Sequence, residues 1–238
     1  MAIWIALTLG AYLLGSVPAA YLVVRLSRRI DLRQYGTGQV GAGNLWRMTS
    51  WKLGLPVGVF DFSKGLVMVW AAQLLDLSIA QQIIVGAAAI AGHNWSVFLR
   101  FHGGRGVATT IGVVFILPFI NINEMTPWPP LAFLTILVVG TVATRSSPVP
   151  VLFSMVALPL VSLFYEPLSV TLGFLTIFLI VVIRRLTARR RITAVPVSNK
   201  RLLFNRLFFD RDIMDRRTWM YQRNLKVGRS EESEQKED

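Results

Sequence analysis

The chain has 238 residues, of which 53% are hydrophobic and only 16% carry a charge. Soluble domains carry about 25% charged residues, so this composition excludes an ordinary soluble domain and indicates a membrane protein. The 25 basic and 13 acidic residues give a net charge of +12. In a membrane protein this excess indicates a surface facing anionic lipid or a phosphorylated substrate, and we expect no nucleic-acid partner. Without cysteine and with only two histidines, the chain can form no disulfide, and we expect no metal and no cofactor.

The first apolar run covers residues 2–24. At about 1.5 Å rise per residue it reaches about 34 Å, enough to cross a hydrocarbon core of about 30 Å. A secretory signal peptide is the alternative, but Arg25 and Arg28 follow the run and no basic residue precedes it. The pattern therefore predicts a membrane-spanning helix over residues 2–24.

Six further apolar runs follow along the chain. They cover residues 53–75, 79–99, 107–120, 129–143, 149–165 and 167–183. We therefore predict an all-α integral membrane protein with about seven transmembrane helices. The runs 107–120 and 129–143 are short for a bilayer and could instead form a re-entrant pair, which would leave five crossings.

The basic residues are distributed unevenly between the two ends of these runs. The turns after the second, fourth and sixth runs contain Asp76, Glu124 and Glu166 and no Lys or Arg, whereas every basic residue except Lys64 falls on the other side. The positive-inside rule makes that other side cytoplasmic. We expect a multi-pass protein of the cell membrane with its N-terminus outside, its C-terminus in the cytoplasm and its active face cytoplasmic.

The chain divides into three parts. Residues 1–188 form a polytopic membrane domain with glycine-rich cytoplasmic loops, and residues 189–229 form a basic, amphipathic, cytoplasmic or interfacial tail. Residues 199–225 alternate apolar with basic side chains, which is typical of a helix lying among anionic lipid headgroups. The alternative is a helix that packs on the protein's own cytoplasmic loops. The acidic end, residues 230–238, is expected to be disordered.

The first glycine-rich loop covers residues 35–47 and has four glycines in eight positions. A backbone this bare can turn successive amides toward an anion. Thr37 and Asn44 add side-chain donors, and Arg47 adds a planar fork that matches phosphate geometry. A tight connector whose arginine meets lipid headgroups is the alternative.

The second glycine-rich loop covers residues 92–110. Gly103, Gly104 and Gly106 surround Arg105 just ahead of a new helix, which brings free amides, the positive end of a helix dipole and a guanidinium to one point. His102, beside the glycines, is a candidate second donor to phosphate. The loop lacks the Gly-Lys-Ser/Thr ending of a Walker motif, so nucleotide hydrolysis is not indicated.

Two charged residues stand inside the second apolar run. Asp61 and Lys64 are three positions apart, on one helix face and close enough to pair, so that each lowers the burial cost of the other. The pair is either functional or a neutralised structural pair. His93, near the end of an apolar run, is more often a packing residue than a base.

These motifs resemble those of the PlsY family, the integral-membrane acyl-phosphate:glycerol-3-phosphate acyltransferases. The family's first loop reads Ser-Gly-Asn-x-Gly-Ala-Thr-Asn followed by an Arg, and residues 37–44 with Arg47 match it. Its second loop reads Gly-His, an apolar stretch and then Gly-Gly-Lys-Gly-Val-Ala-Thr, which residues 92–93 and 103–109 match.

The chain departs from the family pattern at several positions. Thr37 stands for the family's Ser, Gln39 for its Asn, Gly43 for its Thr and Arg105 for its Lys. The third family motif is a His followed three residues later by an Asn, just after the last span. Residues 184–188 read Arg-Arg-Leu-Thr-Ala and contain neither. That His and Asn belong to the family's active site.

The resemblance implies transfer of a fatty acyl group from acyl phosphate to glycerol 3-phosphate for phospholipid biosynthesis, in the plasma membrane of a bacterium. The predicted catalytic residues are Thr37, Arg47 and Arg105. The predicted substrate-binding residues are Gly38, Gln39, Asn44, His102, Gly103, Gly104, Gly106 and Thr109. Acyl phosphate is already activated, so groups that position two phosphates could supply much of the catalysis without a nucleophilic side chain.

Two other functions fit the same residues. One is a catalytically inactive homologue that binds a lipid phosphate or interacts with other membrane proteins, which the missing third motif favours. The other is a small transporter of phosphorylated solutes, for which the intramembrane charges are few. We expect anionic membrane lipids to be partners of the basic tail.

Overall fold

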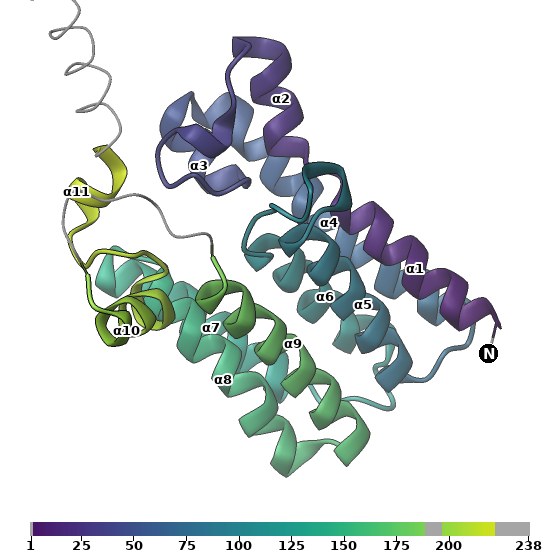
Figure 1. Cartoon of the computed structure of the whole chain (residues 1–238). Helices are drawn as coiled ribbons and strands as arrows, with labels where there is room; N and C mark the ends of the chain where they lie inside the picture. Colours follow the sequence, from purple (N-terminus) through teal and green to yellow (C-terminus); the bar gives the residue numbers. More distant parts are fainter. Residues whose placement is uncertain (1, 189–196, 222–238) are drawn as a thin grey trace, which may run out of the picture.

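The computed structural model describes residues 2–188 and 197–221, and every regular element within them is helical (Figure 1). The helices that correspond to the predicted apolar runs are α1 (Ala2–Ser16) with α2 (Ala19–Arg28), α4 (Trp51–Leu74), α5 (Ile79–Asn94), α6 (Val107–Ile120), α7 (Trp128–Thr144), α8 (Pro148–Tyr165) and α9 (Leu168–Leu186). Five stretches, with α1 and α2 counted as one, are long and apolar enough to cross a membrane. The apolar helices α6 and α7 are shorter, with 14 and 17 residues. The predicted all-helical architecture is confirmed.

The first helix is broken, which corrects the prediction of one helix over residues 2–24. α1 ends at Ser16 and α2 begins at Ala19, because Pro18 has no amide hydrogen and its ring clashes with the preceding turn. The carbonyl groups released at the break have side-chain partners. Ser96 Oγ donates to the Ser16 carbonyl over 2.5 Å, and Lys64 Nζ donates to the Val17 carbonyl over 3.3 Å. The break therefore satisfies its backbone groups within the protein, as a low-dielectric surrounding requires.

The helices α1 and α5 approach each other closely through small residues. Ala11 and Ala89 are fully buried at this contact. A Cβ on Gly15 would overlap the carbonyl oxygen of Ala89, and a Cβ on Gly92 would overlap that of Tyr12. Small residues allow this approach between membrane helices, where van der Waals packing provides much of the attraction.

The main apolar core lies between α5, α6 and the group formed by α7, α8 and α9. Ile83, Val113, Phe133, Met155 and Phe174, one from each of these helices, are all fully buried in it. The outward faces of the helices are also apolar. Exposed large side chains there include Leu9, Val59, Trp70, Phe153 and Leu172, which is the pattern expected of a surface in contact with lipid.

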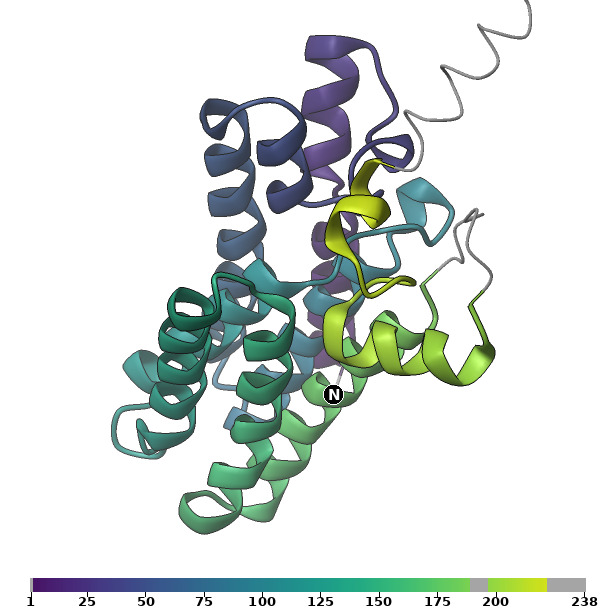
Figure 2. The same cartoon turned by 90° about the vertical axis from the view of Figure 1, so that its left-hand side faces the viewer.

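The loops of interest gather at one end of the helical bundle, opposite the N-terminus (Figures 1 and 2). The short helices η1 (Leu32–Gln34), α3 (Ala42–Met48) and η2 (Val97–Leu99) belong to these loops. α3 packs on α4, and α2 packs on both. This end of the bundle therefore carries both glycine-rich segments.

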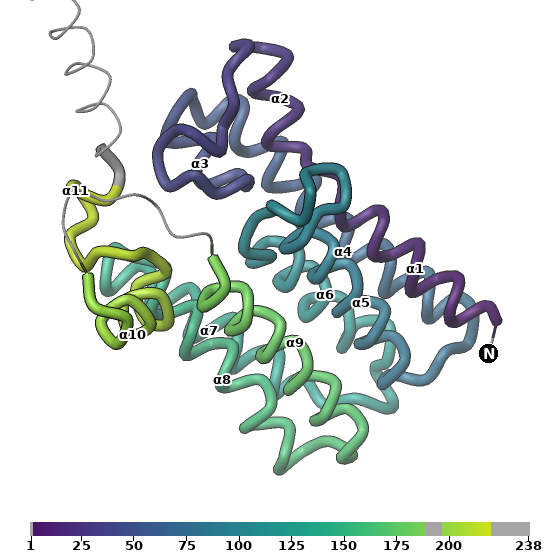
Figure 3. The backbone as a smooth tube through the Cα atoms, viewed as in Figure 1, coloured from purple at the N-terminus to yellow at the C-terminus, as the bar shows by residue number. Residues whose placement is uncertain are grey.

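The C-terminal part does not form one helix over residues 199–225, which corrects that prediction. α10 (Asn199–Phe209) ends where Asp210 adopts a φ of 54° and turns the chain, and α11 (Arg216–Tyr221) follows. α10 packs on α8 and α9, next to their ends (Figure 3), and buries Leu202 and Arg206. This packing agrees with the alternative of a helix resting on the protein itself. Residues 222–225 and the acidic end 230–238 lie outside the described residues.

We expect Gly15→Ala to destabilise the protein by about 1–3 kcal/mol, because the added methyl group must push α1 away from the Ala89 carbonyl. The measurement is the melting temperature of the purified protein in detergent. Gly10→Ala is the matched control, since an added Cβ there meets nothing within 4 Å and alanine favours a helix over glycine. Equal melting temperatures of the two variants would contradict the close α1–α5 contact.

Candidate active site

The first glycine-rich loop is folded around the side chain of Asn44. Asn44 Oδ1 accepts a hydrogen bond from the Thr37 amide over 2.9 Å, and Asn44 Nδ2 donates to the carbonyls of Tyr35 and Gln39, each over 3.1 Å. The chain reverses at Gly38, whose φ is 69°, a conformation that glycine adopts without steric cost. Asn44 therefore shapes the loop, and the side chains of Thr37 and Gln39 are left to face outward from it.

The second glycine-rich loop packs on the end of α5. The amide of Gly103 donates to the Asn94 carbonyl over 3.2 Å, and the amide of Gly104 donates to the His93 carbonyl over 2.9 Å. A Cβ on Gly104 would overlap Nε2 of the His93 ring and crowd the carbonyl oxygen of Val40. These two glycines therefore serve close packing, and the contact with Val40 brings the two glycine-rich loops together.

The start of α6 keeps polar groups that are not satisfied within the protein. The amides of Arg105 and Gly106 make no hydrogen bond within residues 2–188 and 197–221. Asn94 is fully buried beside Gly106, and its Oδ1 and Nδ2 have no partner among the same residues. Buried polar groups without partners are rare in folded proteins and mark places where a ligand or water can bind. No sequence motif distinguishes Asn94 as a binding residue.

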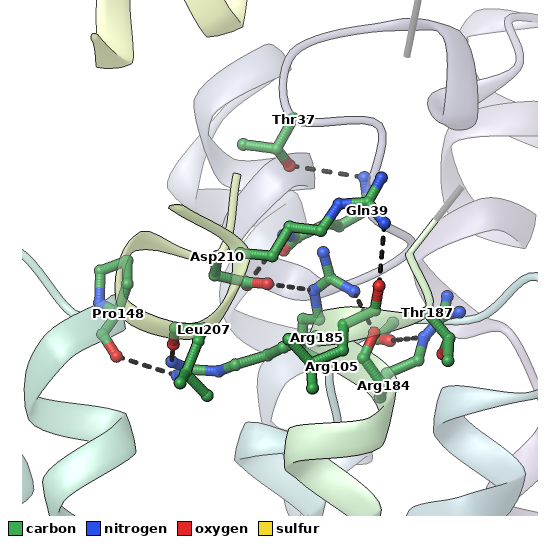
Figure 4. Close-up of polar contacts among 12 residues, drawn as sticks. Thr37, Gln39, Arg105, Pro148, Arg184, Arg185, Thr187, Leu207 and Asp210 are labelled. Carbon is green, nitrogen blue, oxygen red and sulfur yellow. Dashed lines mark hydrogen bonds and ion pairs between the residues drawn. The ribbon is translucent and has the colours of Figure 1, made fainter. Parts of the chain in front are cut away.

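Arg184 and Arg185 end α9, at the place where the resemblance predicts the family's third motif. Arg184 donates from Nε to the Gly104 carbonyl over 2.9 Å and from Nη2 to the Gly103 carbonyl over 2.7 Å (Figure 4). Arg105 Nη1 in turn donates to the Arg184 carbonyl over 2.9 Å. This exchange fixes the second loop against the end of α9.

Asp210, just after α10, joins both glycine-rich loops. Asp210 Oδ1 lies 2.7 Å from Arg105 Nε, and Asp210 Oδ2 accepts a hydrogen bond from Gln39 Nε2 over 3.0 Å (Figure 4). The side chains of Arg105 and Asp210 are only 14% and 13% exposed. Asp210 is not among the predicted site residues, because no local motif distinguishes this aspartate within a basic tail.

A cavity of about 250 Å³ opens between the first loop, the α7–α8 turn and the C-terminal segment. Its lining includes Thr37, Gln39, Arg47, Thr141, Arg145, Ser146, Asp210, Arg211, Arg216 and Trp219. Four of these residues are arginines and one is an acid. Burial lowers the pKa of Arg47, and the nearby charge of Arg216 lowers this pKa further. An anion bound in the cavity would relieve this repulsion.

The predicted site residues fall into three groups. Thr37, Gln39 and Arg47 line the cavity, and Arg105 is joined to it through Asp210. Gly38, Asn44, Gly103, Gly104 and Gly106 form the backbones of the two loops. His102 and Thr109 do not line the cavity. His102 Nδ1 lies 2.6 Å from the Arg100 carbonyl oxygen, and Thr109 is buried against Gly65 of α4.

The two charged residues of α4 pair as predicted. Lys64 Nζ lies 2.8 Å from Asp61 Oδ1, and His93 Nδ1 lies 3.4 Å from the same oxygen. Lys64 also donates to the Val17 carbonyl at the α1–α2 break. The cluster joins α4, α5 and the break beneath the second loop, which supports a structural role. Within the described residues, no three His, Asp or Glu side chains gather into a group that could hold a metal ion.

The fold and the cavity define a helical membrane protein with an arginine-rich pocket at one end. Residues 5–194 match the family described as Glycerol-3-phosphate acyltransferase. The chain is 42% identical over 225 residues to glycerol-3-phosphate acyltransferase 5 of Dehalococcoides mccartyi, with 92% of this chain and 93% of the relative covered. It is 34% identical to the glycerol-3-phosphate acyltransferase of Endomicrobium trichonymphae, with 76% and 88% covered.

A solved structure shares the architecture. The crystal structure of PlsY (YgiH), an integral membrane glycerol 3-phosphate acyltransferase in its glycerol 3-phosphate form, matches with a TM-score of 0.67 and 28% identity. The match covers 76% of this chain and 88% of that chain. The protein therefore belongs to the PlsY family of glycerol-3-phosphate acyltransferases.

We expect Asp61→Asn to destabilise the protein by about 3–5 kcal/mol, because it leaves the buried ammonium group of Lys64 without its anion. Lys64→Met should cost less, since His93 stays beside Asp61. The double variant Asp61→Asn/Lys64→Met should cost less than the two single variants added together, because it leaves no charge unpaired.

Unfolding of the three variants in a double-mutant cycle measures this coupling. Strictly additive effects would show that the two side chains do not interact, and would contradict the ion pair.

Proposed function

We propose that the protein transfers a fatty acyl group from acyl phosphate to the primary hydroxyl of glycerol 3-phosphate, which yields 1-acylglycerol 3-phosphate and inorganic phosphate. Its membership of a family of glycerol-3-phosphate acyltransferases supports this reaction. The assignment of the site rests on the cationic cavity. Thr37, Gln39 and Arg47 of the first loop line this cavity, and its lining residue Asp210 pairs with Arg105 of the second loop.

Glycerol 3-phosphate binds in the cavity. At about 250 Å³ the space lies below the roughly 300–1,000 Å³ of sites for drug-sized ligands, and so suits a small molecule. Arg47 supplies a planar pair of donors for the phosphate oxygens, and Thr37 adds a hydroxyl. Gln39 also lines the cavity and donates to Asp210, the partner of Arg105, so the acceptor hydroxyl would meet the donor beside it.

The phosphate of the acyl donor binds at the start of α6. The free amides of Arg105 and Gly106 and the amide group of Asn94 offer donors there, at the positive end of the α6 dipole. The carboxylate of Asp210 faces the Arg105 guanidinium, and a phosphate bound by Arg105 would displace it. The acyl chain can then extend along α6 into the hydrocarbon layer.

Catalysis follows from positioning and charge. The acceptor hydroxyl oxygen attacks the acyl carbonyl carbon, the bond from that carbon to the phosphate oxygen breaks, and the hydroxyl proton passes to the leaving phosphate. Arg105 neutralises charge on the leaving phosphate as it develops, which is the usual task of fixed cationic donors in acyl and phosphoryl transfer. No nucleophilic side chain, metal or cofactor takes part.

We infer that all seven apolar stretches cross the membrane, with the N-terminus outside and the active face in the cytoplasm of a bacterial cell. Two observations support this topology. α6 packs mainly on α4, and α7 packs mainly on α8, so each runs beside a long apolar helix instead of forming a re-entrant pair with the other. Lys200 and Arg201 are exposed on α10, where they can meet anionic lipid headgroups.

Release of phosphate by the purified protein in detergent or lipidic mesophase tests the reaction. We expect release to require both acyl phosphate and glycerol 3-phosphate. Arg105→Ala and Arg47→Ala should each lower kcat/KM by about 10²–10³-fold, because each removes a charged donor from the reacting phosphates. Arg100→Ala is the control, since this exposed arginine lies in the same loop as Arg105 and outside the cavity.

An inactive homologue is the second candidate, because residues 184–188 lack the family's third-motif His and Asn. Phosphate release no faster than in a buffer blank, from protein that still binds glycerol 3-phosphate, would favour this candidate and contradict the proposed reaction.

A further inference from the structure

The C-terminal segment, residues 198–221, lies beyond the part of the chain that matches the family. The family match ends at residue 194, and the PlsY crystal structure covers 76% of this chain. The match to the Dehalococcoides relative covers 92% of the chain. Because the uncovered remainder is shorter than the stretch from α10 to the end of the chain, the match must include α10. A segment of this kind is therefore shared with that relative and is additional to the family domain.

The segment is held firmly against the membrane domain. Arg185, which is 2% exposed, donates to the Leu207 carbonyl of α10 over 2.7 Å and to the Pro148 carbonyl of α8 over 2.9 Å. Arg206 lies 2.7 Å from Asp212 and donates to the Leu186 carbonyl over 2.8 Å. These buried contacts fix the position of the turn between α10 and α11, residues 210–215.

This turn and α11 contribute one wall of the cavity. Asp210, Arg211, Arg216 and Trp219 line it, together with Thr37 and Arg47 of the first loop. The guanidinium of Arg211 lies 5.3 Å from the centre of the Phe209 ring, which orients it. Half of the four cavity arginines thus come from outside the family domain.

The carboxylate of Asp210 in this wall is already engaged by Arg105 and Gln39, and two other buried polar atoms at the cavity stay unpaired. Nε of Arg211 is buried, as is Oγ1 of Thr141 across the cavity, and neither atom has a hydrogen-bond partner in the described part of the chain. Burial lowers the pKa of Arg211, and the charge of Arg216 lowers this pKa further. A dianion with several acceptor oxygens would satisfy the donors and offset the repulsion between arginines.

We propose that Arg211 and Arg216 of the C-terminal segment bind the phosphate of glycerol 3-phosphate, together with Arg47, and so complete the acceptor site. The inference rests on the reaction proposed above, because it assigns the residues that hold its acceptor. It adds a substrate-binding wall that residues 5–194 alone do not contain.

Steady-state kinetics of the full-length protein test this assignment. Arg211→Ala and Arg216→Ala should each raise the KM for glycerol 3-phosphate about tenfold, and the double variant about 100-fold, as expected for the loss of hydrogen bonds to a charged group. The KM for acyl phosphate should not change. Arg217→Ala is the matched control, because Arg217 neighbours Arg216 on α11 and does not line the cavity.

Melting temperatures show whether the variants fold, and Arg211→Lys and Arg216→Lys provide milder changes that keep the charge and lose the planar fork. We expect these two variants to raise the KM for glycerol 3-phosphate less than the alanine variants do. The kinetics are measured in nanodiscs of phosphatidylcholine and in nanodiscs that also contain phosphatidylglycerol. An effect of the substitutions seen only with phosphatidylglycerol would assign the arginines to lipid headgroups and overturn the inference.

Direct binding of radiolabelled glycerol 3-phosphate separates this inference from the proposed reaction. If the wild-type protein binds it without turnover and the double variant Arg211→Ala/Arg216→Ala does not bind it, the reaction fails and the binding wall stands. An active enzyme whose double variant keeps both affinity and KM would overturn the wall and leave the reaction intact. A double variant with a higher kcat and an unchanged KM would show that the segment only covers the site, which would also overturn the inference. A wild-type protein that does not bind glycerol 3-phosphate would overturn it as well.

Discussion

Two adjacent arginines at the end of α9 hold the functional end of the molecule together. Arg184 donates to the carbonyls of Gly103 and Gly104, and Arg185 donates to those of Leu207 and Pro148. Backbone carbonyls cannot be left unpaired in a buried, low-dielectric region, and a guanidinium satisfies two of them at once. The second loop, the α7–α8 hairpin and the C-terminal segment therefore all take their positions from one point.

The charge of this end suits a protein whose ligands are phosphates. Arg47, Arg145, Arg211 and Arg216 border one cavity, and among the described residues that line it Asp210 is the one acid. Asp210 pairs with Arg105 at the edge of that cavity, so the charge of Arg105 is offset by a carboxylate, whereas the four cavity arginines lie close together. Such an arrangement favours binding of the small dianion over closure of the cavity, because closure would bring the arginines closer together.

The fold was predictable from the sequence because helix length and apolar composition decide it. The apolar runs gave every long helix, and the i, i+3 spacing of Asp61 and Lys64 gave their ion pair. The α1–α2 break was missed although Pro18 marks it, because hydropathy averages over a kink. The hydrogen bonds from the Gly103 and Gly104 amides to carbonyls at the end of α5 were also not predicted. Glycine spacing shows that a backbone can approach something closely, and it does not show whether the neighbour is a ligand or the protein's own chain.

The C-terminal wall of the cavity could not be predicted by local reasoning, since it depends on contacts across most of the chain. Gln39 and Asp210 are 171 residues apart in sequence, and Arg105 and Arg184 are 79 apart. The place predicted for the third motif is in direct contact with the C-terminal segment. The arginine pair that stands in the motif's place binds the second loop with one side chain and the added segment with the other. Because the segment that packs on Arg185 also brings Arg211 and Arg216 into the cavity lining, the contacts that fix this end of the bundle are the same contacts that place half of the four cavity arginines.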